Sequence, residues 1–265
     1  MYEFEYQRPQ QLAQAVAAAV GDEARYLGGG QSLVQSMRLR LASASTLVDL
    51  SAIPELRGIE RSGDSLKIGA MTRHSEVARS ADVRQAIPAL ADLAGEIGDQ
   101  MVRNMGTIGG SIANADPAAD YPAAVLGLGA TVQTDRRSIA GDDFFVDLFT
   151  TALEPGELVV SVSFPIPQRA AYIKFKQPAS RFALVGVMVS QGASGVRVAV
   201  TGVRSHAFRV PEMEQALAGN FSPDAIAGIR IDPAGCNSDL HGSAEYRAAM
   251  VTVMARRAVE KALAG

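Results

Sequence analysis

Two glycine-rich segments carry the residues best suited to bind a ligand. The first is Gly28–Gly30, which is followed by Gln31 and Ser32, and the second is Gly106–Gly110. Glycine has no Cβ atom, so a turn built from glycines lets backbone N–H groups approach an anion closely, and a helix that begins there adds a favourable dipole. We therefore interpret each segment as a candidate cradle for the phosphate groups of a ligand.

The first segment matches none of the named phosphate-binding motifs. A Walker A loop needs Gly-Lys-Ser/Thr, which is absent, and the dinucleotide fingerprint GxGxxG would need glycine at the position of Leu33. Asp49 stands where a ribose-binding acid could lie, but a residue at the end of a strand also serves as a cap. A tight turn at Gly28–Gly30 and a capping role for Asp49 therefore remain the alternatives.

The second segment lies in a longer stretch, residues 102–120, that is poor in bulky side chains. Such a stretch suits contact with a flat or extended ligand. Thr107, Ser111 and Asn114 add hydrogen-bond donors and acceptors, which would suit a chain of hydroxyl groups next to phosphates. Together, the two cradles suggest a diphosphate-bearing cofactor held between two subdomains.

Two aspartates follow this stretch. Asp116 precedes Pro117, a pair that is typical of a helix N-cap and first helical residue. Asp120 would then lie one turn inside that helix. Its carboxylate could accept hydrogen bonds from ligand hydroxyls or lie on the helix surface, and the residues alone leave both open.

The elements around the first segment predict a small parallel α/β unit. The expected order is a strand near Glu5, a helix after Pro9, a strand at residues 25–27, a helix at 31–40 and a strand at 46–50. In the first helix, Leu12, Val16 and Val20 would share one apolar face.

A second block and a C-terminal block follow. The second has strands at residues 66–70, 131–134 and 158–164 and helices at 75–79, 88–97 and 121–128. The third has strands at residues 172–176, 183–190 and 196–203 and helices at 211–217 and 244–263. Two prolines in the segment Pro165–Ala171 interrupt any ladder, so we expect a domain boundary there.

Composition excludes several kinds of chemistry. The chain of 265 residues has one cysteine and three histidines. Cys236 alone cannot hold an iron–sulfur cluster, which takes about four thiolates, and the histidines have no zinc-binding spacing. The sequence therefore predicts no metal site of its own.

Charge and hydropathy exclude other classes. The net charge of −3 comes without a Lys/Arg cluster, so we expect no nucleic-acid binding. No apolar run approaches the ~20 residues of a membrane-spanning helix, and the N-terminal residues show no signal-peptide pattern. We expect a cytoplasmic protein whose chemistry depends on a cofactor or a partner.

At these residues the sequence resembles the FAD-binding subunit of the molybdenum hydroxylases, the family of xanthine dehydrogenase and aerobic carbon-monoxide dehydrogenase. The resemblance covers essentially the whole chain. The matching segments are Leu27–Leu33, Ile68–Thr72 with His74, Arg103–Asn114, Asp116–Asp120, Glu157–Val159, Lys174–Lys176 and Asp239–Tyr246.

The resemblance implies an α+β fold. A two-part FAD-binding region of the PCMH type would occupy residues 1–170, with subdomains at about 1–55 and 56–170. A C-terminal domain of a small antiparallel sheet with helices, as in carbon-monoxide dehydrogenase flavoproteins, would occupy residues 171–265.

The resemblance also implies the residues that contact FAD. They are Tyr26, Leu27, Gly28, Gly29, Gly30, Gln31, Ser32 and Leu33 at the pyrophosphate; Asn104, Thr107, Ile108, Gly109, Gly110, Ser111 and Asn114 in the second cradle; Asp120 at the flavin-side hydroxyls; and Ala70, Thr72, Ile97, Leu158, Val159 and Lys176 along the cofactor and its ring. Phe182 stands where many members have tyrosine, which keeps an aromatic wall but loses the hydroxyl. Because a Cβ atom would occupy the backbone's approach to the ligand, valine at Gly109 or Gly110 is expected to abolish FAD retention and leave the fold largely intact.

Partners follow from the same resemblance. A large subunit would hold the molybdenum cofactor, a small subunit would hold [2Fe-2S] clusters, and this chain would carry FAD in a dimer of heterotrimers. FAD would pass electrons to an external acceptor, so no protein residue needs a catalytic acid, base or nucleophile. The alternatives are a stand-alone flavin oxidase or dehydrogenase of the same broad fold and a non-redox nucleotide-binding assembly module.

Overall fold

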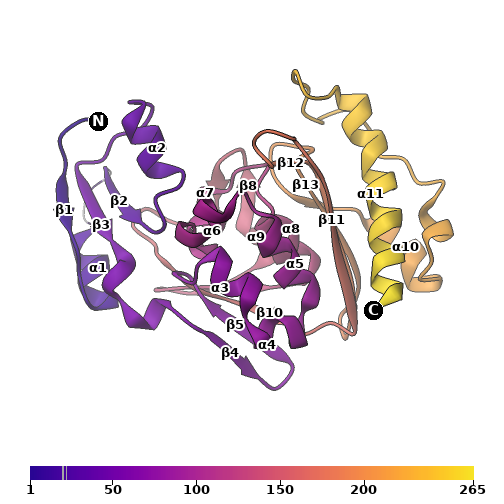
Figure 1. Ribbon diagram of the computed structural model, residues 1–265, viewed down its shortest axis with the longest axis horizontal. Helices are drawn as coiled ribbons and strands as arrows, with labels where there is room; N and C mark the ends of the chain where they lie inside the picture. Colours follow the sequence, from indigo (N-terminus) through magenta and orange to yellow (C-terminus); the bar gives the residue numbers. More distant parts are fainter. Residues whose placement is uncertain (20, 22) are drawn as a thin grey trace.

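The N-terminal part of the chain forms a parallel sheet. The computed structural model describes residues 1–19, 21 and 23–265, and Figure 1 shows its three successive units. Strand β3 (Thr46–Asp49) lies between β1 (Glu5–Gln7) and β2 (Ala24–Leu27) and runs parallel to both. Helices α1 (Leu12–Ala18) and α2 (Leu33–Arg38) connect these strands, as the sequence predicts. Val20 lies outside the described residues.

The middle part is built on an antiparallel sheet. Its order is β4 (Ile59–Ser62), β5 (Ser65–Gly69), β10 (Val159–Pro165), β6 (Thr131–Thr134) and β7 (Ser138–Ala140). Short 3-10 turns, η1 (Leu50–Ala52) and η2 (Pro54–Leu56), lead into it from the first unit. A small hairpin of β8 (Phe145–Asp147) and β9 (Thr150–Thr151) follows β7.

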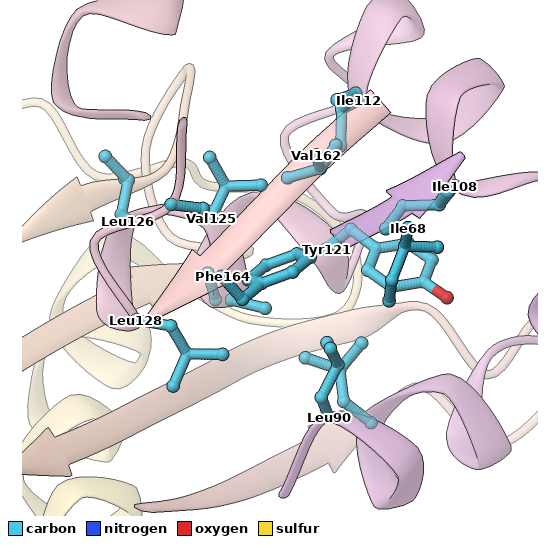
Figure 2. Packing of buried hydrophobic residues seen from close by; sticks show 14 of the residues in the cluster. Ile68, Leu90, Ile108, Ile112, Tyr121, Val125, Leu126, Leu128, Val162 and Phe164 are labelled. Carbon is cyan, nitrogen blue, oxygen red and sulfur yellow. The ribbon is translucent and has the colours of Figure 1, made fainter. Parts of the chain in front are cut away.

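Helices cover the middle sheet. They are α3 (His74–Arg79), α4 (Ala81–Ala86), α5 (Pro88–Glu96), α6 (Gln100–Met105), α7 (Ile108–Asn114), α8 (Tyr121–Gly127) and α9 (Gly141–Phe144). Figure 2 shows Ile68 and Val162 of the sheet together with Leu90, Ile108 and Tyr121 of the helices. All five side chains are fully buried, so this core fixes the position of α7 and α8 on the sheet.

The C-terminal part is an antiparallel meander with helices on one face. Strands β11 (Arg169–Lys176), β12 (Ala183–Gly192), β13 (Gly195–Thr201) and β14 (Phe208–Arg209) are neighbours in that order. Helices α10 (Pro211–Gly219) and α11 (Ala244–Ala264) pack on the face formed by alternate valines of β12 and β13, with η3 (Pro223–Ile226) between them. The opposite face lies against α5 and α8 of the middle unit (Figure 1). Residues 166–168 connect the two sheets.

The segment between α7 and α8 differs from the expectation. Asp116 and Pro117 do not begin a helix, because Asp116 Oδ1 accepts a hydrogen bond from the backbone N–H of Ala118 at 2.8 Å and the chain turns. The N–H of Gly202 donates to the carbonyl of Pro117 at 2.7 Å, so the C-terminal sheet takes up a carbonyl group that a helix would have used. The helix begins only at Tyr121, and Asp120 precedes it instead of lying one turn inside.

Asp49 has the capping geometry that the sequence left as one alternative. Its Oδ1 accepts a hydrogen bond from the backbone N–H of Ser51 at 2.8 Å, at the start of η1.

In the part of the chain that the structure describes, no helix has the length and apolar character needed to cross a bilayer.

Candidate functional site

The two glycine segments lie in direct contact. A Cβ atom on Gly29 would overlap with the carbonyl oxygen of Met105 and would lie 2.6 Å from the Cα of Gly106. A Cβ atom on Gly28 would lie 3.0 Å from Thr107 Oγ1. Since real Cβ atoms keep a larger separation from backbone atoms, glycine at position 29 allows the first loop to pack on the second.

A cavity of about 500 Å³ opens beside this contact. Its volume falls within the range of about 300–1,000 Å³ that is usual for small-molecule sites. Most residues expected at a cofactor line it: Tyr26, Gly28, Gly29, Gly30, Gln31, Ser32, Leu33, Ala70, Ile97, Thr107, Gly109, Gly110, Ser111, Asn114, Asp120, Leu158 and Val159. Ser180, Arg181 and Phe182 of the C-terminal unit line it as well, so the structure brings residues from all three units around one space.

Five of the expected residues lie outside the cavity lining. Leu27 packs with Met37 beneath the first sheet, and Ile108 is fully buried in the core of the middle unit. Thr72 Oγ1 donates to the carbonyl of Gly58 at 3.1 Å, and its position is therefore set by that loop. The remaining two are exposed: Asn104, which accepts a hydrogen bond from Gln100, and Lys176, at the end of β11.

The first loop offers free backbone donors. Among the described residues, the N–H groups of Gly29, Gly30, Gln31 and Ser32 donate to no backbone or side-chain acceptor. Gly30 has a φ of +71°, a left-handed conformation that glycine adopts without strain. Successive unpaired N–H groups at a turn before a helix form a concave anion-binding surface. This loop therefore fits the phosphate-binding role.

The second segment does not offer the backbone donors that we expected. The N–H of Ile108 donates to the carbonyl of Thr72 at 3.1 Å, and that of Gly109 donates to the carbonyl of Ala70 at 2.8 Å. The N–H of Gly110 donates to Thr107 Oγ1 at 3.2 Å, in an N-cap of α7. Because α7 is fixed in this way to the turn after β5, the segment contributes side chains and a close-packed surface to the cavity.

Asp120 is a buried carboxylate in the cavity wall. It is only 4% exposed. Its Oδ1 accepts a hydrogen bond from the hydroxyl of Tyr172 at 2.5 Å, and its Oδ2 lies 2.9 Å from Lys174 Nζ. Burial raises the pKa of Asp120, and the Lys174 ammonium and the Tyr172 hydroxyl act against that rise. Burial and the charge of Asp120 together raise the pKa of Tyr172.

Sequence reasoning missed the importance of Tyr172 and Lys174. Both are on β11 and share one face of the strand because their spacing is two, and the sequence pattern predicts the same face for Lys176, although the register with β12 shifts between Phe175 and Lys176. The sequence favoured Lys176 as the lysine nearest the cofactor, but the strand directs Lys174 into the protein and leaves Lys176 at its exposed end. The alternation alone could have linked the three residues, although it could not show which lysine is buried.

Glu157 lines the cavity at the base of β10. Both of its carboxylate oxygens lie 3.0 Å from guanidinium nitrogens of Arg137, and Thr134 Oγ1 donates to Oε1 at 2.7 Å. The Arg137 hydrogen bonds lower the pKa of Glu157 to about 2. This buried, ionised group holds the segment that leads into Leu158 and Val159.

His74 forms part of the cavity wall as a neutral side chain. It is 5% exposed, and its ring centroid is 5.4 Å from that of Tyr121. Burial, together with the nearby Arg103 charge, lowers the pKa of His74 to about 4. Its Nδ1 has no hydrogen-bond partner among the described residues. Met71, Val102 and Arg181 also line the cavity without having been predicted there, and so does Phe182, which the resemblance describes as an aromatic wall.

The comparison with protein families decides the class of the chain. Residues 2–167 match the family described as the FAD binding domain in molybdopterin dehydrogenase. The chain belongs to this family of FAD-binding subunits. Its members are components of oxidoreductases, and their cofactor is FAD. The α+β fold expected for such a subunit is confirmed.

Similar proteins match this FAD subunit over nearly its whole length. The carbon monoxide dehydrogenase medium chain of Hydrogenophaga pseudoflava is 36% identical and aligns over 98% of this chain and 97% of its own. The 6-hydroxypseudooxynicotine dehydrogenase complex subunit alpha of Paenarthrobacter nicotinovorans is 36% identical over 92% and 88% of the two chains. A solved structure of carbon monoxide dehydrogenase from Oligotropha carboxidovorans matches with a TM-score of 0.92 at 35% identity, covering 99% of this chain and 98% of that chain.

The residues of the cavity fit FAD chemically. A diphosphate needs hydrogen-bond donors, and the free N–H groups of residues 29–32 supply them. A hydroxyl-bearing chain needs acceptors, and Asp120 supplies a carboxylate with two oxygens. A flat aromatic ring needs apolar walls, for which Ile97, Leu158 and Val159 are suitable.

Proposed function

We propose that this FAD subunit transfers electrons from iron–sulfur clusters of a small partner subunit to an external acceptor, within a complex whose large subunit holds the molybdenum cofactor. The observation that carries the proposal is the single cavity formed by both glycine segments in a chain of the medium-subunit type. A chain with one cysteine cannot supply the thiolates of a cluster, so the clusters belong to another chain.

In this proposal the protein residues bind and orient the cofactor. Bound FAD supplies the redox chemistry, since it can exchange both single electrons and electron pairs. The N–H groups of residues 29–32 hold the diphosphate, Ser111 and Asn114 contact the phosphates and hydroxyls beside it, and Asp120 accepts a hydrogen bond from the hydroxyl chain. Leu158 and Val159 keep water from one side of the ring.

The division into domains is also part of the proposal. We place the FAD-binding region at residues 1–170, with subdomains at about 1–55 and 56–170, and the C-terminal domain at 171–265. The short connection at residues 166–168 supports this division, because the middle sheet ends at Pro165 and the next begins at Arg169. A dimer of heterotrimers in the cytoplasm completes the proposed assembly.

Purification from the native host tests the proposed function. The expected result is that the chain co-purifies with one larger and one smaller subunit, and that substrate bleaches the flavin absorbance of the complex but not of the isolated chain. A stand-alone oxidase or dehydrogenase would instead run alone and reduce its flavin directly from substrate. That outcome would overturn the electron-transfer proposal and leave FAD binding intact.

A further inference from the structure

A buried lysine lies behind the wall of the cavity. The side chain of Lys174 is 0% exposed, and its ammonium group donates to Asp120 Oδ2 at 2.9 Å and to the carbonyl of Glu96 at 3.2 Å. Lysine is rarely fully buried, because an ammonium group that loses its water needs charged or polar partners. Lys174 itself does not line the cavity, so it can act on a ligand only through Asp120.

Asp120 has two fixed donors and room for more. Tyr172 binds one oxygen and Lys174 binds the other. An ionised carboxylate can accept about four hydrogen bonds, so each oxygen keeps capacity for a donor in the cavity. A protonated carboxyl group would be a weaker acceptor. The strength of Asp120 as a hydrogen-bond acceptor for a ligand hydroxyl thus depends on its ionisation. Burial disfavours the ionised form, and the Lys174 ammonium group stabilises it.

The same C-terminal sheet also holds the backbone that leads to Asp120. Thr201 Oγ1 lies within hydrogen-bonding distance of the carbonyl oxygens of Pro117, at 2.9 Å, and Ala119, at 2.7 Å. The N–H of Ala183 donates to the carbonyl of Ala118 at 3.3 Å. Side-chain and backbone contacts from this one sheet therefore fix both the path of residues 117–119 and the direction of the Asp120 carboxylate.

We propose that Lys174 is a positioning residue for FAD, which keeps Asp120 ionised and directed so that the carboxylate accepts a hydrogen bond from a hydroxyl of the cofactor. This inference rests on the proposed contact between Asp120 and FAD. It gives the C-terminal sheet a part in cofactor binding, although the family match covers only residues 2–167.

Other charged and titratable groups lie around Asp120, and the control experiments must separate their titration from that of Asp120. They are Tyr172 and Lys174 on β11, Glu96 on α5 and Tyr121 on α8. Burial raises the pKa of Glu96, so this residue is a second carboxylate whose protonation must be separated from that of Asp120. Glu96→Gln, introduced together with Lys174→Met, therefore separates the two carboxylates.

The test is a titration of the full chain with FAD, followed by flavin fluorescence, at pH 6, 7 and 8. We expect Lys174→Met to weaken FAD binding about tenfold or more at pH 6, because a charge-assisted hydrogen bond is lost. Affinity should then recover as the pH rises and Asp120 ionises, also in the Glu96→Gln background. Lys67→Met, which removes an exposed lysine on β5, should leave affinity unchanged at every pH. Lys174→Arg should retain most of the affinity.

A double-mutant comparison completes the test. Asp120→Asn should weaken binding without pH dependence, and adding Lys174→Met to it should cause no further loss, because the two residues act as a unit. An additional loss in the double variant, or a loss in Lys174→Met that does not change with pH, would overturn the inference. Lys174→Met alone could fail to fold, because it leaves Asp120 buried without its cation. In that case the FAD affinities of Asp120→Asn and of the double variant, in which both buried side chains are neutral, still show whether Lys174 acts through Asp120. Failure of the unaltered chain to bind FAD would instead contradict the cofactor site itself.

Discussion

Gly29 and the carbonyl group of Met105 approach so closely that no side chain fits between them. Gly29 belongs to the loop after β2 in the parallel sheet, and Met105 ends helix α6 in the middle unit. Their contact closes one side of the cavity and joins two units that are distant in the sequence. We therefore expect the packing of loop on loop to shape the proposed FAD site as much as the free N–H donors of the first loop do.

Gly29→Ala is expected to destabilise the chain and weaken FAD binding together. The added methyl group would force the loops apart, at a cost of about 1–3 kcal/mol in the free energy of unfolding. Urea denaturation of the apo chain measures the first effect, and flavin fluorescence measures the second. Gly219→Ala is the matched control, because a Cβ atom there meets no atom within 4 Å. Unchanged stability and affinity in Gly29→Ala would show that the loops do not need this contact.

Gly109→Val is expected to disturb the fold, which corrects the prediction made from sequence. A Cβ atom at Gly109 would lie 2.5 Å from Ala70 Cβ and 2.8 Å from the Ala70 carbonyl oxygen, on the side where α7 packs against β5. Overpacking of this kind lowers stability by about 1–3 kcal/mol or more. Gly110 is exposed, and a Cβ atom there meets only Thr107 Oγ1 at 2.9 Å, so Gly110→Ala should be milder.

The urea denaturation midpoints of the apo Gly109→Val and Gly110→Ala chains show whether the Gly109 substitution destabilises the fold. A Gly109→Val chain that is as stable as the unaltered one, yet lacks FAD, would restore the original interpretation that its Cβ atom blocks the ligand.

The Glu157 network predicts a loss of stability in strong acid. The folded-state pKa of about 2 lies below the ordinary value of 4.5. The stabilisation from ionised Glu157 is therefore fully present above about pH 5 and is lost as the pH falls from 4.5 toward 2. Glu157→Gln should lower the free energy of unfolding at pH 7 by about 1.5–3 kcal/mol, the range for a hydrogen bond to a charged group.

Urea unfolding at pH 7 and pH 3 measures this effect. The difference in free energy of unfolding between Glu157→Gln and the unaltered chain should be smaller at pH 3 than at pH 7. A difference that stays constant would contradict the ionised Glu157 as the source of the stability.

The lowered pKa of His74 predicts a second and smaller loss of folding stability in acid. Its folded-state pKa of about 4 lies below the ordinary 6.5, so between these values the unfolded chain binds a proton that the folded chain does not. Stability should thus fall as the pH drops from 6.5 toward 4, by roughly 2 kcal/mol at pH 5. His74→Gln should flatten the profile between pH 7 and pH 5 in urea unfolding. A profile with the same slope in both chains would exclude His74 as the cause.

Local patterns in the sequence predict most of the fold. The alternation of strands and helices up to Asp49 predicts the parallel sheet, because each helix is long enough to return the chain to the same edge. The sequence likewise predicts a helix at residues 244–263, which matches α11 to within one residue at its end. These elements depend on contacts that are local or repeated along the chain.

The parts that sequence reasoning missed depend on single long-range contacts. The sequence suggests that Gly109 offers its N–H group to a ligand, but the carbonyl of Ala70, in the turn after β5, accepts that hydrogen bond. Lys174 and Lys176 are equivalent in the strand pattern, and only the position of α5 and Asp120 separates them. Asp116 has the sequence of an N-cap, but the carbonyl groups after it are bound by β13 and by the turn that follows it. No periodicity records such contacts.

The amount of FAD bound by the purified full chain tests the central claim most directly. After incubation with excess FAD and removal of the free cofactor by gel filtration, the absorption spectrum should show one FAD per chain. The Gly29→Ala variant should retain less under the same conditions. A colourless chain, or an equal flavin content in the unaltered chain and the Gly29→Ala variant, would contradict the account.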